Sequence, residues 1–274
     1  MRVRVQHETA YSYETPATRA IQIVRLAPRG HDGQFVVNWR IDVDQDCRLE
    51  ATTDPFGNRV HAFTVEGPLE RLTITAEGEI ETFDTHGIIT GQVERFPPVV
   101  FLRDTALTTA DAAIRALGDE AATDAGSDRL ALLHRLMDAI RERMRFDTDG
   151  TDPRTSAPDA FALGHGVCQD FAHIFIAAAR HLEIPARYVG GYMYRVDEVN
   201  DQDAGHAWAE ALVDDLGWVG FDPANGISPT DAHIRVAVGL DYLGAAPVRG
   251  TRYGGQDEEL SVKVQLRPGG KSFR

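Results

Sequence analysis

The feature that most limits the possible folds of this chain is a change in the period of its apolar residues near residue 100. In residues 35–43 every odd-numbered side chain is apolar, which is the period of a strand with one buried face. In residues 130–144 the apolar side chains recur at positions i, i+3, i+4 and i+7, which is the period of a helix packed on one side. A strand-rich half followed by a half that contains helices predicts an α+β protein.

The first hundred residues predict an all-β, sandwich-like domain. Strands are expected over Arg2–Gln6, Ala20–Leu26, Phe35–Val43, Arg59–Val65 and Arg71–Ile80. Turn signals rich in Pro and Gly separate them, at residues 28–30, 54–58 and 66–68. This half has no cluster of His, Cys and carboxylates with catalytic or metal-binding spacing, so we expect it to support or dock the other half.

The second half begins after an irregular stretch at residues 84–106 that contains Gly87, Gly91, Pro97 and Pro98. Ser127 is a candidate N-cap for a helix that runs to Met144. A polar loop follows, then a second helix over Cys168–Leu182, and further strands after it. The expected domains are therefore residues 1–100, the β domain, and residues 101–274, the catalytic domain.

The charge of the chain excludes some partners. Lys and Arg number 28 and Asp and Glu number 42, which gives a net charge of −14. We therefore expect neither nucleic acid nor a membrane surface to be the partner, because both carry negative charge. The first residues alternate like a strand and do not have the apolar core of a signal peptide. With two widely spaced cysteines, Cys47 and Cys168, a reducing cytoplasm is the expected location.

Residues 164–173 form the most informative window of the sequence. Glycines at 164 and 166 allow a sharp bend, and Cys168 then opens a helix that is apolar nearly all round. A thiol at a helix N-terminus faces unpaired N–H groups and the positive end of the helix dipole, which stabilise a thiolate. Cys168 is thus a candidate nucleophile, although a lone cysteine is often simply part of a core.

A histidine and an aspartate further along the chain provide possible partners for Cys168. His206 starts a strand, residues 214–217 form a turn, and a returning strand ends at Asp222. The two open ends of a hairpin lie close together, although a simple register leaves His206 and Asp222 a few residues out of step. Cys, His and Asp supply a nucleophile, a base and a group that orients the base.

Several motifs resemble the bacterial transglutaminase-like family. They are Gly-Val-Cys-Gln-Asp-Phe-Ala-His (166–173), Ile-Pro-Ala-Arg-Tyr-Val-Gly-Gly-Tyr (184–192), His-Ala-Trp-Ala-Glu (206–210), Gly-Trp-Val-Gly-Phe-Asp-Pro-Ala-Asn-Gly (217–226) and, in the β half, Asp-Pro-Phe-Gly-Asn (54–58). The resemblance implies a papain-like, transglutaminase-like core, a Cys168–His206–Asp222 triad, no required cofactor, and that family's N-terminal β domain.

The implied reaction is acyl transfer from an amide of a peptide or protein substrate, through a thioester on Cys168. Animal crosslinking transglutaminases have Trp directly after the nucleophile, whereas this chain has Gln169. We therefore favour hydrolysis, by a peptidase, isopeptidase or amidase, over transamidation to an amine acceptor. A papain-like domain that has lost activity and serves as a binding scaffold is a third possibility, which the intact triad disfavours. The sequence does not indicate the oligomeric state.

Two other interpretations concern the window around Cys168. His165, Cys168 and His173 could be metal ligands, but the set has no fourth member at zinc-like spacing, so no metal is expected. His173 lies five residues along the helix from Cys168 and therefore faces elsewhere, as a hydrogen-bonded core histidine would. Asp170 could bind the backbone or a cation such as Arg187, or be a first-turn helix acid.

The strands after the window contain further candidates. Trp208 and Trp218 could line the site, although aromatic residues of strands more often belong to a core. Glu210 shares a strand face with His206, and we expect it to give structural support.

Overall fold

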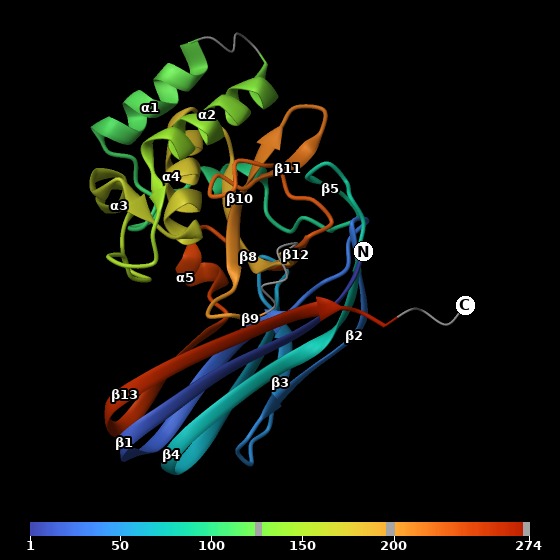
Figure 1. The fold of residues 1–274 in the computed structure, drawn as a ribbon, viewed down its shortest axis with the longest axis vertical. Coiled ribbons are helices and arrows are strands. Elements are labelled where there is room, and N and C mark those ends of the chain that lie inside the picture. The colour runs from blue at the N-terminus through green and yellow to red at the C-terminus, as the bar shows by residue number, and fades with distance from the viewer. Residues whose placement is uncertain (124–127, 196–200, 271–274) are drawn as a thin grey trace.

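A computed structural model describes residues 1–123, 128–195 and 201–270. The strands of the N-terminal sheet are β1 (Arg2–Ala27), β2 (Gln34–Val43), β3 (Glu50–Thr53), β4 (Arg59–Thr82), β9 (Asp201–Gln202) and β13 (Val248–Pro268). Their order is β2-β4-β1-β13-β9, with β3 beside β4, and all the pairs are antiparallel. The sheet forms the lower layer in Figure 1.

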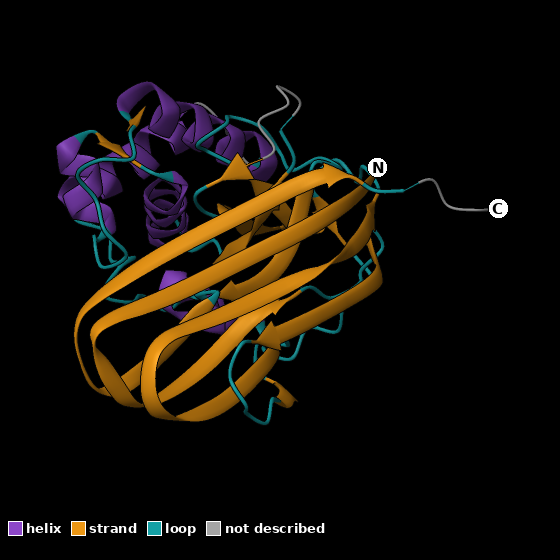
Figure 2. Cartoon of the chain, turned by 60° about the horizontal axis from the view of Figure 1, so that its bottom comes forward, coloured by secondary structure: helices purple, strands orange, loops and turns teal. Residues whose placement is uncertain are grey.

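The long strands fold this sheet over on itself. Figure 2 shows β1, β4 and β13 curving round at one end, so that two layers of the same sheet face each other. At the bend the β1–β4 register shifts between Ser12 and Ala17, and Gly254 and Gly255 of β13 have positive φ angles of 66° and 73°. Apolar side chains from both layers form the core between them. The sandwich-like domain expected from the sequence is thus made from one folded sheet.

Two details of the expected strands were wrong. Arg2–Gln6 and Ala20–Leu26 are parts of the single strand β1, and Arg59–Val65 and Arg71–Ile80 are parts of β4. Gly67 and Pro68, which look like part of a turn in the sequence, lie where β4 bends, and β1 bends near Pro16. The pairing of the two strands resumes on either side of the bend.

The second sheet has the order β12-β8-β10-β11-β5. Its strands are β5 (Ile88–Ile89), β8 (Ala186–Met193), β10 (His206–Val213), β11 (Gly217–Phe221) and β12 (His233–Gly239). The helices are α1 (Ala112–Thr123), α2 (Arg129–Arg143), α3 (Ala157–Leu163), α4 (Cys168–His181), α5 (Tyr242–Ala245) and the 3-10 helix η1 (Pro98–Leu102). Helix α4 packs on one face of the sheet, with the other helices around α4 (Figure 1). The short strands β6 (Arg145–Phe146) and β7 (His165–Gly166) pair in parallel. No helix in the described ranges is long and apolar enough to cross a membrane.

Helix α4 lies at the centre of this half because it is apolar nearly all round. Its residues 169–180 are all buried. The facing residues of β10 are Ala207, Ala209 and Ala211, whose small side chains let the helix approach the sheet closely. Phe175 of α4 stacks on Phe221 of β11 with ring centroids 5.1 Å apart. This packing fixes the position of Cys168, the first residue of the helix.

Helix α2 begins slightly later than expected. Asp128 is its N-cap, and the Asp128 carboxylate accepts a hydrogen bond from the N–H of Ala131 at 2.9 Å. The N-cap expected from the sequence, Ser127, lies outside the described residues. Asp and Ser are equally good N-caps, so the sequence pattern did not distinguish neighbouring positions.

The two sheets are joined through the edge strand β12. The side-chain amide of Gln34 donates to the carbonyl of Arg235 and accepts from its N–H, both at 2.8 Å. The side-chain amide of Asn58 likewise donates to the carbonyl of Val238 at 2.7 Å and accepts from the Val238 N–H at 2.8 Å. Two amides of the N-terminal sheet thus pair with the free backbone edge of β12, where another strand would otherwise pair.

The C-terminal strand crosses the domain boundary expected at residue 100. Strand β13 lies in the N-terminal sheet, where it pairs with β1 from Val3–Pro268 to Val24–Val248. Val264 and Leu266 of β13 are buried in a core shared with α4 and β10. Residues 101–274 therefore do not form a separate structural unit, because their last strand completes the N-terminal sheet.

Candidate active site

Cys168 is the first residue of α4, and its side chain is half-buried. The turn before it is held by Asp170, whose Oδ2 accepts hydrogen bonds from the N–H of Val167 and the hydroxyl of Thr151, both at 2.8 Å. Gly166 leaves room for this carboxylate, because a Cβ at that position would lie 2.4 Å from Asp170 Oδ2. The loop and the helix start together hold the thiol in one place.

His206 and Asp222 meet at the open end of the β10–β11 hairpin. The β10–β11 register pairs Ala209 with Phe221, so its extension would place Ala224, not Asp222, opposite His206. The side chains bridge this offset of two residues: His206 Nε2 lies 2.7 Å from Asp222 Oδ2. Because Nε2 is used by Asp222, Nδ1 is the ring nitrogen left for the Cys168 side chain, which also hydrogen-bonds His206.

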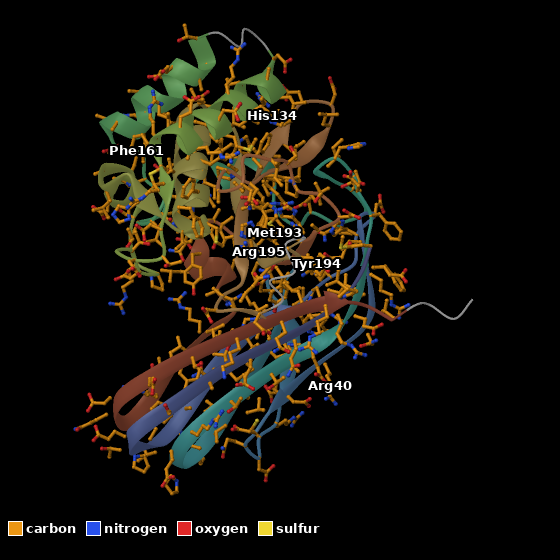
Figure 3. All side chains as sticks on the ribbon, in the orientation of Figure 1. Arg40, His134, Phe161, Met193, Tyr194 and Arg195 are labelled. Carbon is orange, nitrogen blue, oxygen red and sulfur yellow. The ribbon has the colours of Figure 1, made fainter. Side chains whose placement is uncertain are left out.

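Asp222 has two further partners that the sequence analysis missed. Asn225 donates its side-chain amide to Oδ2 at 2.7 Å and its backbone N–H to Oδ1 at 3.2 Å. His233 Nε2 lies 3.1 Å from the same Oδ2. The Asn225 amide also lies 3.4 Å from the sulfur of Met193, which Figure 3 places at the end of β8, above the N-terminal sheet. Asn225 lies within the motif at residues 217–226 and could have been found there, whereas no local pattern marks His233.

The electrostatics of the site favour a charged pair. Burial lowers the pKa of His206, but the hydrogen bonds and charges of Asp222 and Cys168 outweigh it and raise that pKa to about 10. Burial raises the pKa of Asp222, but the donors His206, His233 and Asn225 hold it well below its ordinary value. The site therefore favours a protonated His206 imidazolium beside the Asp222 carboxylate.

His206, Asp222 and His233 also have donor atoms close enough together to suggest a metal site among the described residues. Ligands at ~2.0–2.1 Å from a tetrahedral zinc ion stand about 3.3 Å apart. The 2.7 Å between His206 Nε2 and Asp222 Oδ2 is shorter than that, and both histidines point Nε2 at the same carboxylate oxygen. The geometry fits a hydrogen-bond network better than a set of metal ligands.

The other residues singled out in the window have structural contacts. His173 is fully buried, and its Nε2 accepts the N–H of Tyr242 at 3.0 Å, which fits the expected core histidine. Asp170 binds the backbone rather than Arg187, and burial raises its pKa. His165 pairs with Arg145 in the small β6–β7 sheet.

A buried ion cluster lies on the same strand as His206. Glu210 is fully buried between Arg187 and Arg235, with Nε–O distances of 2.6 Å and 2.7 Å, as expected for structural support. Arg187 also lies 3.8 Å over the ring of Trp218, which places that tryptophan in the cluster rather than at the site. The ring of Trp208, by contrast, lies 6.0 Å from that of His206.

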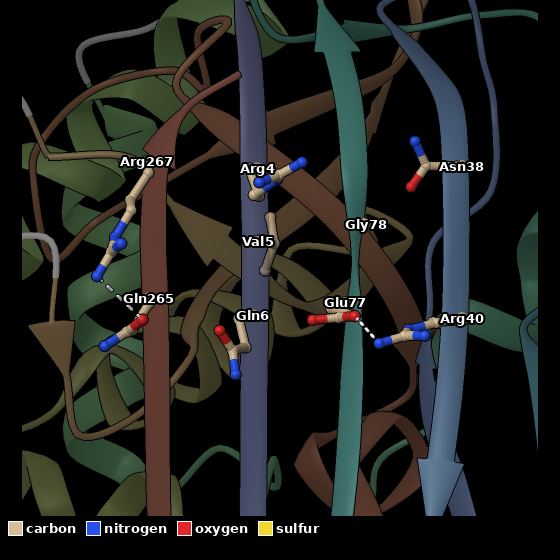
Figure 4. A pocket seen from close by; sticks show the side chains of 9 residues that line it. All are labelled: Arg4, Val5, Gln6, Asn38, Arg40, Glu77, Gly78, Gln265 and Arg267. Atoms are coloured by element: carbon tan, nitrogen blue, oxygen red, sulfur yellow. Dashed lines mark hydrogen bonds and ion pairs between the residues drawn. The ribbon is translucent and has the colours of Figure 1, made fainter. Parts of the chain in front are cut away.

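A hollow lies on the N-terminal sheet, away from these residues. Its volume is about 320 Å³, and Figure 4 shows side chains of β13, β1, β4 and β2 lining it. Arg40 is paired with Glu77, and Arg4 with Glu79 at 3.2 Å. Since two of its three arginines have carboxylate partners, the hollow has little unpaired positive charge to attract an anion.

A buried helix that begins with cysteine, packed on an antiparallel sheet that carries a histidine and an aspartate, defines a papain-like fold. Residues 115–223 match the Transglutaminase-like superfamily, and residues 3–81 match the Bacterial transglutaminase-like N-terminal region. The chain belongs to the bacterial transglutaminase-like family, as the motifs predicted.

Its relatives match nearly the whole length of the chain. The uncharacterized protein ML0607 of Mycobacterium leprae is 32% identical over 97% of this chain and 98% of its own length. The uncharacterized protein Rv2569c of Mycobacterium tuberculosis is 28% identical over 97% of this chain and 93% of its own. A crystal structure from Cytophaga hutchinsonii, described as that of a candidate cysteine protease, superimposes with a TM-score of 0.77 at 19% identity, covering 100% of this chain and 92% of the other. That likeness confirms the fold.

Proposed function

We propose that this protein is a cysteine-dependent acyl-transfer enzyme that acts on amide bonds of peptides or proteins through Cys168, His206 and Asp222. The observation that carries the proposal is the division of the two His206 nitrogens, with Nε2 bound to Asp222 and Nδ1 left for Cys168. This is the geometry a general acid and base needs beside a nucleophile.

The first half of the reaction is acylation of the thiol. The Cys168 thiolate attacks the amide carbonyl carbon, a C–S bond forms, and the carbonyl oxygen becomes negative. The N–H of Cys168 is a donor for that oxygen, because the first N–H groups of a helix are not used by the helix itself. His206 then gives its Nδ1 proton to the leaving nitrogen, the C–N bond breaks, and a thioester remains.

The second half removes the acyl group. Neutral His206 accepts a proton from water at Nδ1 while the water oxygen attacks the thioester carbonyl carbon. Collapse of this intermediate breaks the C–S bond, releases a carboxylic acid and restores the thiolate–imidazolium pair. Asp222 keeps its hydrogen bond to Nε2 throughout, which holds the ring in place and stabilises its charged form.

Hydrolysis is the outcome we favour, because Gln169 follows the nucleophile where animal crosslinking transglutaminases have Trp. The alternative is transamidation, in which a primary amine takes the place of water; the match to the transglutaminase-like superfamily keeps it open. Incubation with a glutamine peptide and a labelled primary amine separates the two. Release of ammonia without incorporation of the label supports hydrolysis, and incorporation would overturn that preference.

We further propose a cytoplasmic location and no nucleic-acid, membrane or cofactor requirement, on the basis of charge, cysteine content and site chemistry. A silent binding scaffold is the remaining alternative for the fold. The test that separates an enzyme from a scaffold is the reactivity of Cys168.

Cys47 supplies an internal control for that test, since both cysteines are free. Burial, followed by the charges of Asp46 and Asp44, raises the pKa of Cys47. With limiting iodoacetamide at about pH 6, where an ordinary thiol is protonated, we expect mass spectrometry to find Cys168 alkylated well before Cys47. His206→Ala is expected to slow the alkylation of Cys168 at least tenfold and to leave the alkylation rate of Cys47 unchanged. Equal, slow labelling of both thiols would contradict an activated nucleophile.

A further inference from the structure

His233 is the first residue of β12, and its side chain faces the site from a strand other than β10, which carries His206, and β11, which ends just before Asp222. Its side chain is 2% exposed, and its Nε2 lies 3.1 Å from Asp222 Oδ2. We propose that His233 is a positioning residue, a neutral imidazole that donates its Nε2 proton to Asp222 and holds the carboxylate in the orientation His206 requires. This inference rests on the function proposed above.

The tautomer of His233 is determined by its other ring nitrogen. Nδ1 lies 3.1 Å from the backbone N–H of Thr230, which can only donate. A nitrogen that accepts a hydrogen bond carries no proton, so the ring proton of the neutral imidazole is on Nε2. The N–H of His233 also donates to the carbonyl of Thr230 at 3.1 Å. Backbone and ring are thus bound to the same residue, which fixes the direction of Nε2.

The donors around Asp222 show what this hydrogen bond does. Oδ2 accepts hydrogen bonds from the His206 ring and the Asn225 side-chain amide at 2.7 Å and from the His233 ring at 3.1 Å. Oδ1 accepts one from the backbone N–H of Asn225 at 3.2 Å. They come from the start of β10, the turn after β11 and the start of β12. Donors from several directions prevent the carboxylate from rotating, so its Oδ2 stays in line with His206 Nε2.

The same hydrogen bond limits how strongly Asp222 attracts the His206 proton. The groups facing this pair in the described structure are the Cys168 thiol, the Asn225 amide, the Trp208 ring and His233. A carboxylate that loses one of its donors becomes a stronger acceptor for the donors that remain. Without the His233 N–H, His206 is expected to keep its proton to higher pH.

Two substitutions separate the donor from the aromatic ring. His233→Phe keeps a ring against Trp208, whose centroid lies 5.3 Å from that of His233, but has no N–H. His233→Gln has no ring but places an amide N–H near the position of Nε2. With p-nitrophenyl acetate as an activated acyl donor, we expect His233→Phe to lower kcat about tenfold with little change in KM. The basic limb of its pH profile should move to higher pH. His233→Gln should stay within about threefold of the unchanged protein.

A measurement on the unchanged protein does not depend on how the variants fold. Nitrogen NMR of the His233 ring should show a protonated Nε2 and an unprotonated Nδ1 at neutral pH. A protonated Nδ1, or activity kept by His233→Phe but lost by His233→Gln, would overturn the inference. If Cys168 labelling depends on His206 but neither His233 variant differs from the unchanged protein, this inference alone fails. If Cys168 is not activated at all, the proposed function fails and the inference with it.

Discussion

His206 and Asp222 are in hydrogen-bond contact although they are not opposite each other in the β10–β11 ladder. The ladder pairs Ala209 with Phe221, and Asp222 then leaves it to bridge with Ile227. This departure turns the Asp222 side chain toward His206, with 2.7 Å between Oδ2 and Nε2. The contact depends on the turn after β11 as much as on the two residues themselves.

Asp222→Asn should strongly reduce the reactivity of Cys168. An amide has no negative charge to stabilise the imidazolium, so the pKa of His206 should fall from its raised value and the thiolate should lose its cationic partner. We expect iodoacetamide labelling of Cys168 at about pH 6 to slow at least tenfold, with the rate of Cys47 unchanged. Unchanged labelling of Cys168 would show that Asp222 does not act through His206.

Gln34→Ala and Asn58→Ala should each loosen the contact between the two sheets. Each change leaves an N–H and a C=O of β12 without the amide that pairs with them, at Arg235 or at Val238. A buried unsatisfied polar group costs about 1–3 kcal/mol, so the midpoint of chemical unfolding should fall.

Gln45→Ala is the matched control for these two variants, because the Gln45 amide donates to Arg71 O in an exposed position. We expect its midpoint to stay close to that of the unchanged protein. An equal effect of all three changes would argue against a special role for the β12 edge.

Glu210→Gln should destabilise the fold by about 3–5 kcal/mol, since it leaves Arg187 and Arg235 buried without their shared counter-charge. The same carboxylate predicts an acid limit in the unchanged protein. Burial raises the pKa of Glu210, but the two arginines outweigh the effect of burial and lower this pKa from 4.5 to about 2. Its stabilisation is fully present above pH 4.5 and is lost as the pH falls toward 2.

The role of Glu210 in acid stability can be tested by measuring thermal unfolding from neutral to acid pH. The melting temperature should fall steeply below about pH 4.5 in the unchanged protein and less steeply in Glu210→Gln. Parallel curves for the two proteins would indicate that other groups set the acid limit.

A fragment of residues 101–274 should not fold alone. It lacks β1, the partner of β13 along nearly its whole length, and Val3, Val5 and Ile80, which belong to the core shared with α4. An unpaired strand of this length also favours aggregation. Circular dichroism and size exclusion should show an unfolded or aggregated fragment, whereas a monomer with cooperative unfolding would support an independent catalytic domain.

Local patterns in the sequence predicted much of the fold and the placement of most residues of the candidate site. The apolar helix behind Cys168, the strand that starts at His206 and the return to Asp222 all lie where the pattern places them. Such patterns are informative because burial of one face imposes a fixed period on a helix or strand. The sequence did not show that β1 and β4 continue through their bends, because Pro and Gly occur both at bends within a strand and at turns between strands.

The sequence by itself determined the candidate catalytic side chains: a thiol at a helix start, a histidine at a strand start and an aspartate just after a strand. Only the tertiary structure decided that β13 returns to β1, that Gln34 and Asn58 pair with the edge of β12, and that His233 and Asn225 share Asp222 with His206. These contacts join segments that are far apart in the chain, and the local sequence of one segment does not indicate which other segment it contacts. A hydrogen bond between distant residues forms only once burial of the core has brought their strands together.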